Sequence, residues 1–386
     1  MRVTRDIDIA EECVQDAYAQ ALVAWPAQGV PNKPGAWLTA VARRKALDLL
    51  RRDAVLRRAL PLLVSDDVEP APEITDEIPD DRLRLICTCC HPALAPDAQV
   101  ALTLRLLCGL STAEVARAFL VSEPTMAARI TRAKKKIAAA GIPYRVPTAS
   151  ELPARVDAVL AVVHLVFTTG HTAPAGEDLV RADLTGRALD LARMLYLLVP
   201  GNPDVTGLLA LIVLTDARRN TRVDEAGALV LLADQDRTRW DRGEIDEGIA
   251  LAREALRSRP PSRYALQAAI AAVHDEAPTW ESTDWNELVA LYGVLARMWP
   301  SPVVALNRAV AIGFARGPAA GLAALDALGD EPQLAGYGYL PAARAALLHR
   351  LGRDDEARTA YEEALLLTEN GVERQFLAGR LAALAE

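Results

Sequence analysis

Residues 110–137 have the sequence LSTAEVARAFLVSEPTMAARITRAKKKI, and this stretch predicts two short helices joined by a tight turn. Ser111 is followed three residues later by Glu114, the spacing of a capping box, so a helix is expected to begin there. Ser122 can cap a second helix, whose first turn tolerates the proline that follows. The stretch therefore predicts a helical hairpin with a turn of about three residues.

The second helix of this hairpin has an apolar face and a basic face. Its apolar side chains recur at spacings of three and four and are expected to point inward, namely Met126, Ile130, Ala133 and Ile137. Cations on the other face suit DNA phosphates, which give affinity without sequence information, namely Arg129, Arg132, Lys134 and Lys135. Small side chains beside them could touch thymine methyl groups or let the backbone approach the bases, namely Thr125, Ala127, Ala128 and Thr131. The pattern predicts a DNA-binding helix-turn-helix, and the structural alternative is a solvated basic helix end.

Most of the remaining sequence also predicts helices, so the fold class is all-α. An apolar stripe marks the first helix, made of Ile7, Ala10, Val14, Ala17, Ala21 and Trp25. Further helices are expected over about 36–52, 82–90, 97–107, 111–119 and 122–139. After residue 148 the chain becomes Ala/Leu-rich helical hairpins, and Gly317 and Gly352 recur at close to the period of about 34 residues of a tetratricopeptide unit. A short β-hairpin is expected only near 222–236.

Charge divides the chain into four segments. Residues 1–58 carry ten Lys/Arg and seven Asp/Glu, and residues 82–147 carry ten and three. Residues 59–81 form an acidic linker with eight carboxylates and no base, which is expected to be extended and flexible. Residues 148–386 have a net charge of −10. Two basic modules before an acidic body favour nucleic acid as the partner of the first third, although the whole chain has a net charge of −8.

Other features of the sequence exclude several classes of protein. The charged amino terminus lacks a signal-peptide core, and the longest apolar run is too short to span a bilayer, so a cytoplasmic location without membrane contact is expected. Five cysteines in 386 residues fit a reducing compartment. No phosphate loop, nucleophile elbow or paired carboxylates are present, so the chain is not expected to be an enzyme or to need a cofactor.

The stretch CTCCHP, residues 87–92, contains three thiols and an imidazole, which are zinc-ligand chemistries. A closed zinc site needs four ligands, and Cys108 is the one further cysteine nearby. Buried structural cysteines at the end of a helix are therefore the preferred interpretation, with no metal expected, and redox sensing is the alternative.

With these residues placed, the chain resembles the extracytoplasmic-function sigma factors of the sigma-70 family that carry a tetratricopeptide-like, DUF6596-type carboxyl-terminal extension. EECVQDAYAQALVAW and PGAWLTAVARRKALDLLRR are similar to two helices of sigma region two. The run from RLRLICTCCHP through ITRAKKKI is similar to region four, and RADLTGRALDLARMLYLLVP, LLALIVLTDARRNTRVD and DQDRTRWDR are similar to the extension. The resemblance implies a sigma factor that directs core RNA polymerase to promoters, with residues 1–58 as region two, 82–147 as region four and 148–386 as a regulatory extension.

The resemblance also implies roles for individual residues. Region two would bind the polymerase clamp through Gln15, Asp16 and Tyr18, and region four would bind the flap. The −10 element would be contacted by Asn32, Lys33, Trp37, Arg43, Arg44 and Lys45, with one base flipped out of the strand. The −35 element would be read by the basic helix described above. Core packing is the alternative for Trp37, and a solvated face is the alternative for Arg43–Lys45.

Two expectations concern the ends of the chain. The family carries a helix before the one near Ile7, so residues 1–58 are expected to lack the first helix of region two. The acidic extension is expected to cover the basic helix or to bind a regulatory protein, so deletion of residues 148–386 should raise promoter output, unless the extension is required for activity. The rival function is a helix-turn-helix regulator with a repeat domain that does not replace the sigma subunit.

Overall fold

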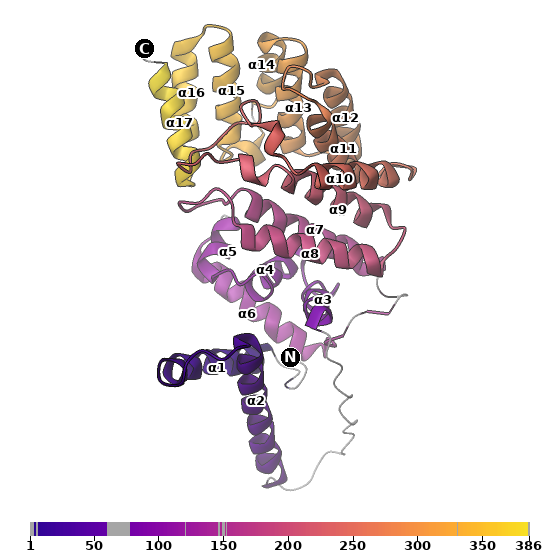
Figure 1. The fold of residues 1–386 in the computed structure, drawn as a ribbon, viewed down its shortest axis with the longest axis vertical. Helices are drawn as coiled ribbons and strands as arrows, with labels where there is room; N and C mark the ends of the chain where they lie inside the picture. Colours follow the sequence, from indigo (N-terminus) through magenta and orange to yellow (C-terminus); the bar gives the residue numbers. More distant parts are fainter. Residues whose placement is uncertain are drawn as a thin grey trace. The chain divides into compact units, whose positions relative to one another are not determined.

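The computed structural model describes residues 4, 7–59, 78–119, 121–145, 147–148, 151, 153–329 and 331–384. Their regular structure is helical, with only isolated β-bridges, so the all-α prediction is confirmed (Figure 1). The helices are α1 Ile7–Gln28, α2 Pro34–Ala59, α3 Ile78–Cys89, α4 Pro96–Leu106, α5 Thr112–Ala118, α6 Glu123–Ala139, α7 Pro153–His171, α8 Ala182–Leu198, α9 Pro203–Asp216, α10 Arg242–Ala255, α11 Arg263–Glu276, α12 Trp285–Met298, α13 Pro302–Ala315, α14 Pro318–Asp326, α15 Tyr339–Arg350, α16 Asp354–Leu367 and α17 Gly371–Ala383. Short 3₁₀ helices are η1 Arg219–Thr221, η2 Arg237–Arg239 and η3 Pro332–Leu334.

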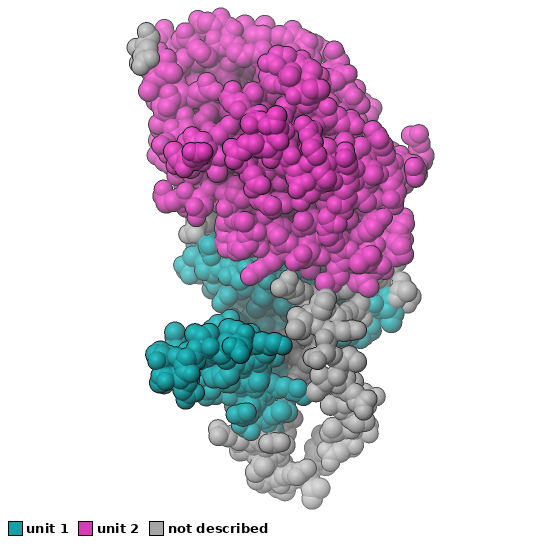
Figure 2. All heavy atoms as spheres, in the orientation of Figure 1, with its two compact units in different colours: residues 1–116, 121–158 teal, residues 117–120, 159–386 magenta. Residues whose placement is uncertain are grey.

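The chain divides into two compact units, coloured separately in Figure 2. Unit 1 comprises residues 1–116 and 121–158, and unit 2 comprises residues 117–120 and 159–386. Unit 1 therefore holds α1 to α4, most of α5, α6 and the start of α7, and unit 2 holds the remaining helices. The predicted acidic linker falls mostly outside the described residues.

Helix α1 packs against α2 through a narrow stripe. Its buried residues are Ile7, Cys13, Ala17 and Ala21. Val14, expected in this stripe, is 46% exposed, so that part of the prediction is wrong. Cys13, Ala17 and Ala21 are spaced by four, which aligns small side chains along one line and suits a close helix crossing.

The helix-turn-helix forms as its sequence predicts. The backbone N–H of Ser111 donates to Glu114 Oε2 at 2.7 Å, and the N–H of Glu114 donates to Ser111 Oγ at 3.1 Å. Both bonds of the capping box are therefore present. Ser122 accepts from the backbone N–H of Thr125, and the predicted inward set Met126, Ile130, Ala133 and Ile137 is buried.

Unit 2 is a succession of helical hairpins packed in chain order from α8 to α17 (Figure 1). Helix α9 contacts α8, α10 and α11, and ten of its fourteen residues are buried. A Cβ on Gly207 would lie 2.6 Å from the backbone nitrogen of Ala265, so only glycine allows α9 and α11 to meet this closely. Gly317 and Gly352 both have positive φ and occupy equivalent hairpin turns, before α14 and α16, as their spacing predicts.

The segment between α9 and α10 forms a buried polar joint. Arg237 is 7% exposed, and its Nη1 donates to the carbonyl oxygens of His274 at 2.6 Å and Ala277 at 2.7 Å, at the end of α11. Its guanidinium also lies 4.5 Å from the centroid of buried Trp240. The expected β-hairpin is reduced to one bridge, between Val223 and Leu229. Hydrogen bonds to carbonyl oxygens and the contact with the Trp240 ring hold this joint together.

The last helix of unit 2 is attached to the loop that follows α7. Asn370 is fully buried, and its Nδ2 donates to the carbonyl oxygens of Ala173 at 3.0 Å and Asp178 at 2.9 Å. Its Oδ1 accepts from the first backbone N–H groups of α17, and Gly371 N donates to Gly176 O at 2.8 Å. One asparagine therefore caps α17 and joins it to a segment almost two hundred residues earlier in the chain.

Three histidines of unit 2 make its stability sensitive to acid. Burial lowers the pKa of His164 to about 4 and that of His274 to about 3, and it lowers the pKa of His171 well below 6.5. Burial instead raises the pKa of Asp275 to about 6, against the pull of neighbouring arginines. Near pH 5 the three histidines bind protons in the unfolded chain but not in the folded chain, which destabilises the fold as pH falls. Asp275, and the carboxyl groups of Asp216, Glu244 and Glu373, whose pKa values burial also raises, offset part of this effect.

The expected result is that unit 2 becomes less stable as pH falls from 7 to 5, because the histidines lose more on folding than the buried carboxyl groups regain. The measurement is thermal unfolding followed by circular dichroism across this range. His274→Gln should reduce the slope by about one proton. A melting temperature that stays constant between pH 7 and 5 would contradict the assignment.

Candidate nucleic-acid interface

The outer face of α6 is open over most of its length. Six of the predicted DNA-contacting residues are exposed, namely Thr125, Ala127, Ala128, Thr131, Arg132 and Lys135. The hydroxyl of Thr125 lies 2.8 Å from Ser122 Oγ, which fixes it at the start of the helix. The buried stripe on the opposite side attaches α6 to α4, so the exposed face is rigidly presented.

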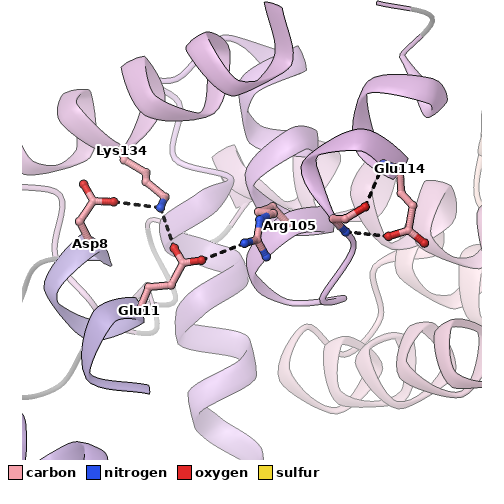
Figure 3. A network of polar contacts seen from close by, with 6 residues as sticks. Asp8, Glu11, Arg105, Glu114 and Lys134 are labelled. Carbon is pink, nitrogen blue, oxygen red and sulfur yellow. Dashed lines mark hydrogen bonds and ion pairs between the residues drawn. The ribbon is translucent and has the colours of Figure 1, made fainter. Parts of the chain in front are cut away.

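Two predicted phosphate contacts on α6 already have partners in unit 1. Arg129 Nη1 lies 3.2 Å from Asp97 Oδ2 at the start of α4. Lys134 Nζ donates to Asp8 Oδ1 at 2.9 Å and to Glu11 Oε2 at 2.7 Å, and only 13% of its side chain is exposed (Figure 3). Burial lowers the pKa of Lys134, but the hydrogen bonds to Glu11 and Asp8 outweigh it, so the pKa is raised and the amine stays charged.

The predicted −10 residues lie on α2 and the loop before it. Asn32, Lys33, Arg43 and Arg44 are exposed. Trp37 is half-buried and packs edge-to-face against Trp25, with ring centroids 5.6 Å apart. This contact fits the alternative that Trp37 packs in the core of unit 1, while part of its indole ring remains accessible to solvent.

The structure brings a predicted DNA residue and a predicted polymerase residue together. Lys45 Nζ lies 2.6 Å from Asp16 Oδ2, between α2 and α1. Gln15 and Tyr18, the other predicted polymerase contacts, are exposed on α1. The pair therefore links the helix expected to bind polymerase to the helix expected to face the opened strand.

Sequence reasoning missed two features of unit 1. Helix α1 exposes a row of large apolar side chains, namely Val14, Tyr18, Leu22 and Val23. The sequence contains a sign of this row, because these large apolar residues lie on a different helix face from the small buried residues Cys13, Ala17 and Ala21. The contact of Glu11 with Arg105 and Lys134 was also missed, because its partners lie 94 and 123 residues away in the sequence.

The CTCCHP segment lies in the core between α3 and α4. The five cysteines of the chain are all buried. Burial raises the pKa of the Cys89 thiol to about 12, and it raises that of Cys90 well above its usual value. His91 Nδ1 accepts from the backbone N–H of Ala93 at 3.1 Å. Among the residues described above, no three His, Cys, Asp or Glu side chains are arranged to hold a metal ion.

These thiols are expected to be chemically inert in the folded protein. The thiolate is the reactive form, and a buried thiol with a raised pKa yields very little of it. At pH 8, fewer than one thiol per chain should react with a chromogenic disulfide reagent within minutes, and all five should react after unfolding in guanidinium. Rapid reaction of one or more thiols in the native chain would instead favour the redox alternative.

The end of α7 and the first residue of the loop after it form a structural joint. Arg222 donates to the carbonyl oxygen of His171 and, at 2.9 Å, to Thr172 Oγ1. The imidazole of His171 stacks on Phe167 at 5.6 Å. These contacts join the end of α7 to the segment that follows η1.

Comparison with known proteins agrees with this organisation. Residues 1–55 match the family described as Sigma-70 region 2, residues 85–137 match Sigma-70, region 4, and residues 155–256 match a family of unknown function, DUF6596. The chain is 45% identical over its whole length to the uncharacterized protein R00370 of Rhizobium meliloti (strain 1021), covering 92% of that protein. No solved structure matches the chain. In the described part of the chain, no helix has the length and apolar character needed to cross a bilayer.

Proposed function

The chain belongs to the sigma-70 family, as an extracytoplasmic-function factor with a DUF6596 extension, and from that premise we propose how its parts divide promoter recognition. A sigma factor recognises promoters together with core RNA polymerase and is not itself an enzyme. We propose that α6 reads the −35 element as duplex, while α2 and the loop before it engage the −10 element as an opened strand. Core polymerase would bind through Gln15, Asp16 and Tyr18 on the clamp side and through region four on the flap side.

The observation that carries this proposal is the outer face of α6. It combines small exposed side chains at Thr125, Ala127, Ala128 and Thr131 with the exposed cations Arg132 and Lys135. Small side chains let a helix backbone approach base edges, and the cations neutralise phosphates on either side. The buried stripe on the other face holds this surface in one orientation.

Run-off transcription tests the proposal. Purified full-length chain plus core polymerase should yield transcripts from promoters that neither component transcribes alone. The rival regulator would bind DNA but would fail to start transcription with core polymerase, so the same assay separates the two functions.

The DUF6596 extension is proposed to modulate this activity. Its net charge of −10 over residues 148–386 makes it unsuited to DNA and suited to a basic surface or a protein regulator. A truncation should end after Ala158 and not after residue 147, because Arg155 belongs to unit 1 and donates to Cys87 O at 3.3 Å. A different transcript yield from residues 1–158 and from the full chain would support modulation, and equal yields would contradict it. The proposed site of action is the cytoplasm, where core polymerase works.

A further inference from the structure

We propose that Asp8 and Glu11, near the start of α1, act as an internal mimic of a DNA phosphate, which holds Lys134 of α6 until duplex DNA replaces it. This inference rests on the proposed function of α6, and it adds a regulatory contact that the function does not require. The competing partner is the phosphate backbone of duplex DNA, and the internal partner is the carboxylate pair of Asp8 and Glu11.

The geometry at Glu11 is the first support. Its two carboxylate oxygens bond to cations from different helices: Oε1 lies 3.1 Å from Arg105 Nη2 on α4, and Oε2 lies 2.7 Å from Lys134 Nζ on α6 (Figure 3). A phosphate that spans two basic side chains offers its oxygens in the same way. Asp8 adds a second acceptor for Lys134 at 2.9 Å.

Burial is the second support. The Lys134 side chain is 13% exposed and that of Glu11 is 24% exposed, so the pair is shielded from water more than an ordinary surface ion pair. Arg132 and Lys135, one to two residues away on the same helix, are exposed. The contact therefore withdraws Lys134 from a basic face on which Arg132 and Lys135 remain exposed.

The consequence for binding follows from charge. While the contact lasts, α6 presents one cation fewer to DNA, and the two α1 carboxylates repel phosphates that approach Lys134. Duplex DNA and α1 therefore compete for the same ammonium group. Any event that draws α1 away from α6, including engagement of its exposed face by polymerase, would release Lys134.

Zero-length cross-linking tests the contact in the full chain. A water-soluble carbodiimide activates a carboxylate, and an adjacent amine displaces the activated oxygen, forming an amide bond while the carbodiimide leaves as its urea. Mass spectrometry should find Lys134 joined to Asp8 or Glu11. The Lys45–Asp16 pair, at 2.6 Å, is the internal control. Absence of the Lys134 product when the Lys45–Asp16 product forms would overturn the proposal.

Competition with DNA is the second part of the test. A saturating 30-base-pair duplex should reduce the Lys134 product at least fivefold. An unreduced Lys134 product with duplex bound would overturn the proposal.

A matched pair of variants measures the effect on affinity. Glu11→Gln should bind the duplex about three to five times more tightly and steepen the dependence of log K on log salt by about one, because one more phosphate is contacted. Glu12→Gln removes the same charge from the next, exposed residue and should change affinity by less than about 1.5-fold. Equal affinities of the two variants would overturn the proposal. If α6 does not bind DNA as proposed, duplex binding would instead be insensitive to replacement of Arg132 and Lys135. This result is distinguishable from equal affinities of the Glu11 and Glu12 variants.

Discussion

Replacing Arg132 and Lys135 together by alanine is expected to lower duplex affinity and run-off transcription by about 30-fold at 0.15 M salt. Both side chains are exposed on the outer face of α6 and are proposed to contact phosphates. Each phosphate contact contributes about fivefold to affinity at this salt concentration through release of counterions, and two independent contacts multiply. The slope of log K against log salt should also become less steep by about two. Affinity is measured by fluorescence anisotropy and transcript yield by run-off assay.

The control for this pair removes the same charge elsewhere. Arg297 and Arg316 are exposed in unit 2, so their double alanine variant has the same net charge without touching α6. It should keep affinity within about twofold of the parent chain. If both double variants lose affinity equally, net charge and not the α6 surface would explain the effect.

Replacing Arg237 by alanine is expected to destabilise unit 2 by about 3–5 kcal/mol, because two charge-assisted hydrogen bonds are lost and buried carbonyls lose their donor. The contact with Trp240 is lost as well, which adds about 1 kcal/mol at most. In a unit of this size the melting temperature should fall by about 6–15 °C. Urea unfolding followed by tryptophan fluorescence measures the change. Trp240 contacts Arg237 directly, and Trp280 stacks on His274, whose carbonyl oxygen accepts a hydrogen bond from Arg237.

Arg239 provides the matched control on the same short helix. It lies two residues after Arg237 but is exposed, so Arg239→Ala should change stability by less than about 0.5 kcal/mol. Arg237→Lys should fall between the two, because an ammonium keeps the charge but lacks the guanidinium plane that lies over the indole. Equal unfolding midpoints for Arg237→Ala and Arg239→Ala would show that the buried joint does not stabilise unit 2.

The local features of unit 1 follow from its sequence because short-range rules decide them. The capping box at Ser111 and Glu114 and the inward stripe of α6 depend only on residues a few positions apart. The same rules failed at Val14, because apolar spacing alone does not say which of two adjacent rows of α1 meets α2. The small residues Ala17 and Ala21 decided it, since they allow the closer crossing.

Long-range contacts could not be predicted from the sequence. The residues near Glu11 in the sequence do not indicate that its carboxylate oxygens bond to Arg105 and Lys134, since such pairs form only when helices from distant segments pack together. The roles of Asn370 and Arg237 are of the same kind, because each serves backbone carbonyls and any carbonyl could have been the partner. Residue identity predicts that a buried polar side chain must find partners, but only the fold determines which ones.

The contact made by Asn370 restricts how the extension can change in evolution. When each helical hairpin contacts only its neighbours, a repeat domain can gain or lose hairpins at either end, as many repeat proteins do. In unit 2 the loop after α7 is hydrogen-bonded to the start of α17 through Asn370 and Gly371. Inserting or deleting a hairpin between them would separate the two segments and break these hydrogen bonds. Because both ends of the row of hairpins must meet at this contact, the number of hairpins is fixed. Relatives should vary in loop length while keeping the same number of helices.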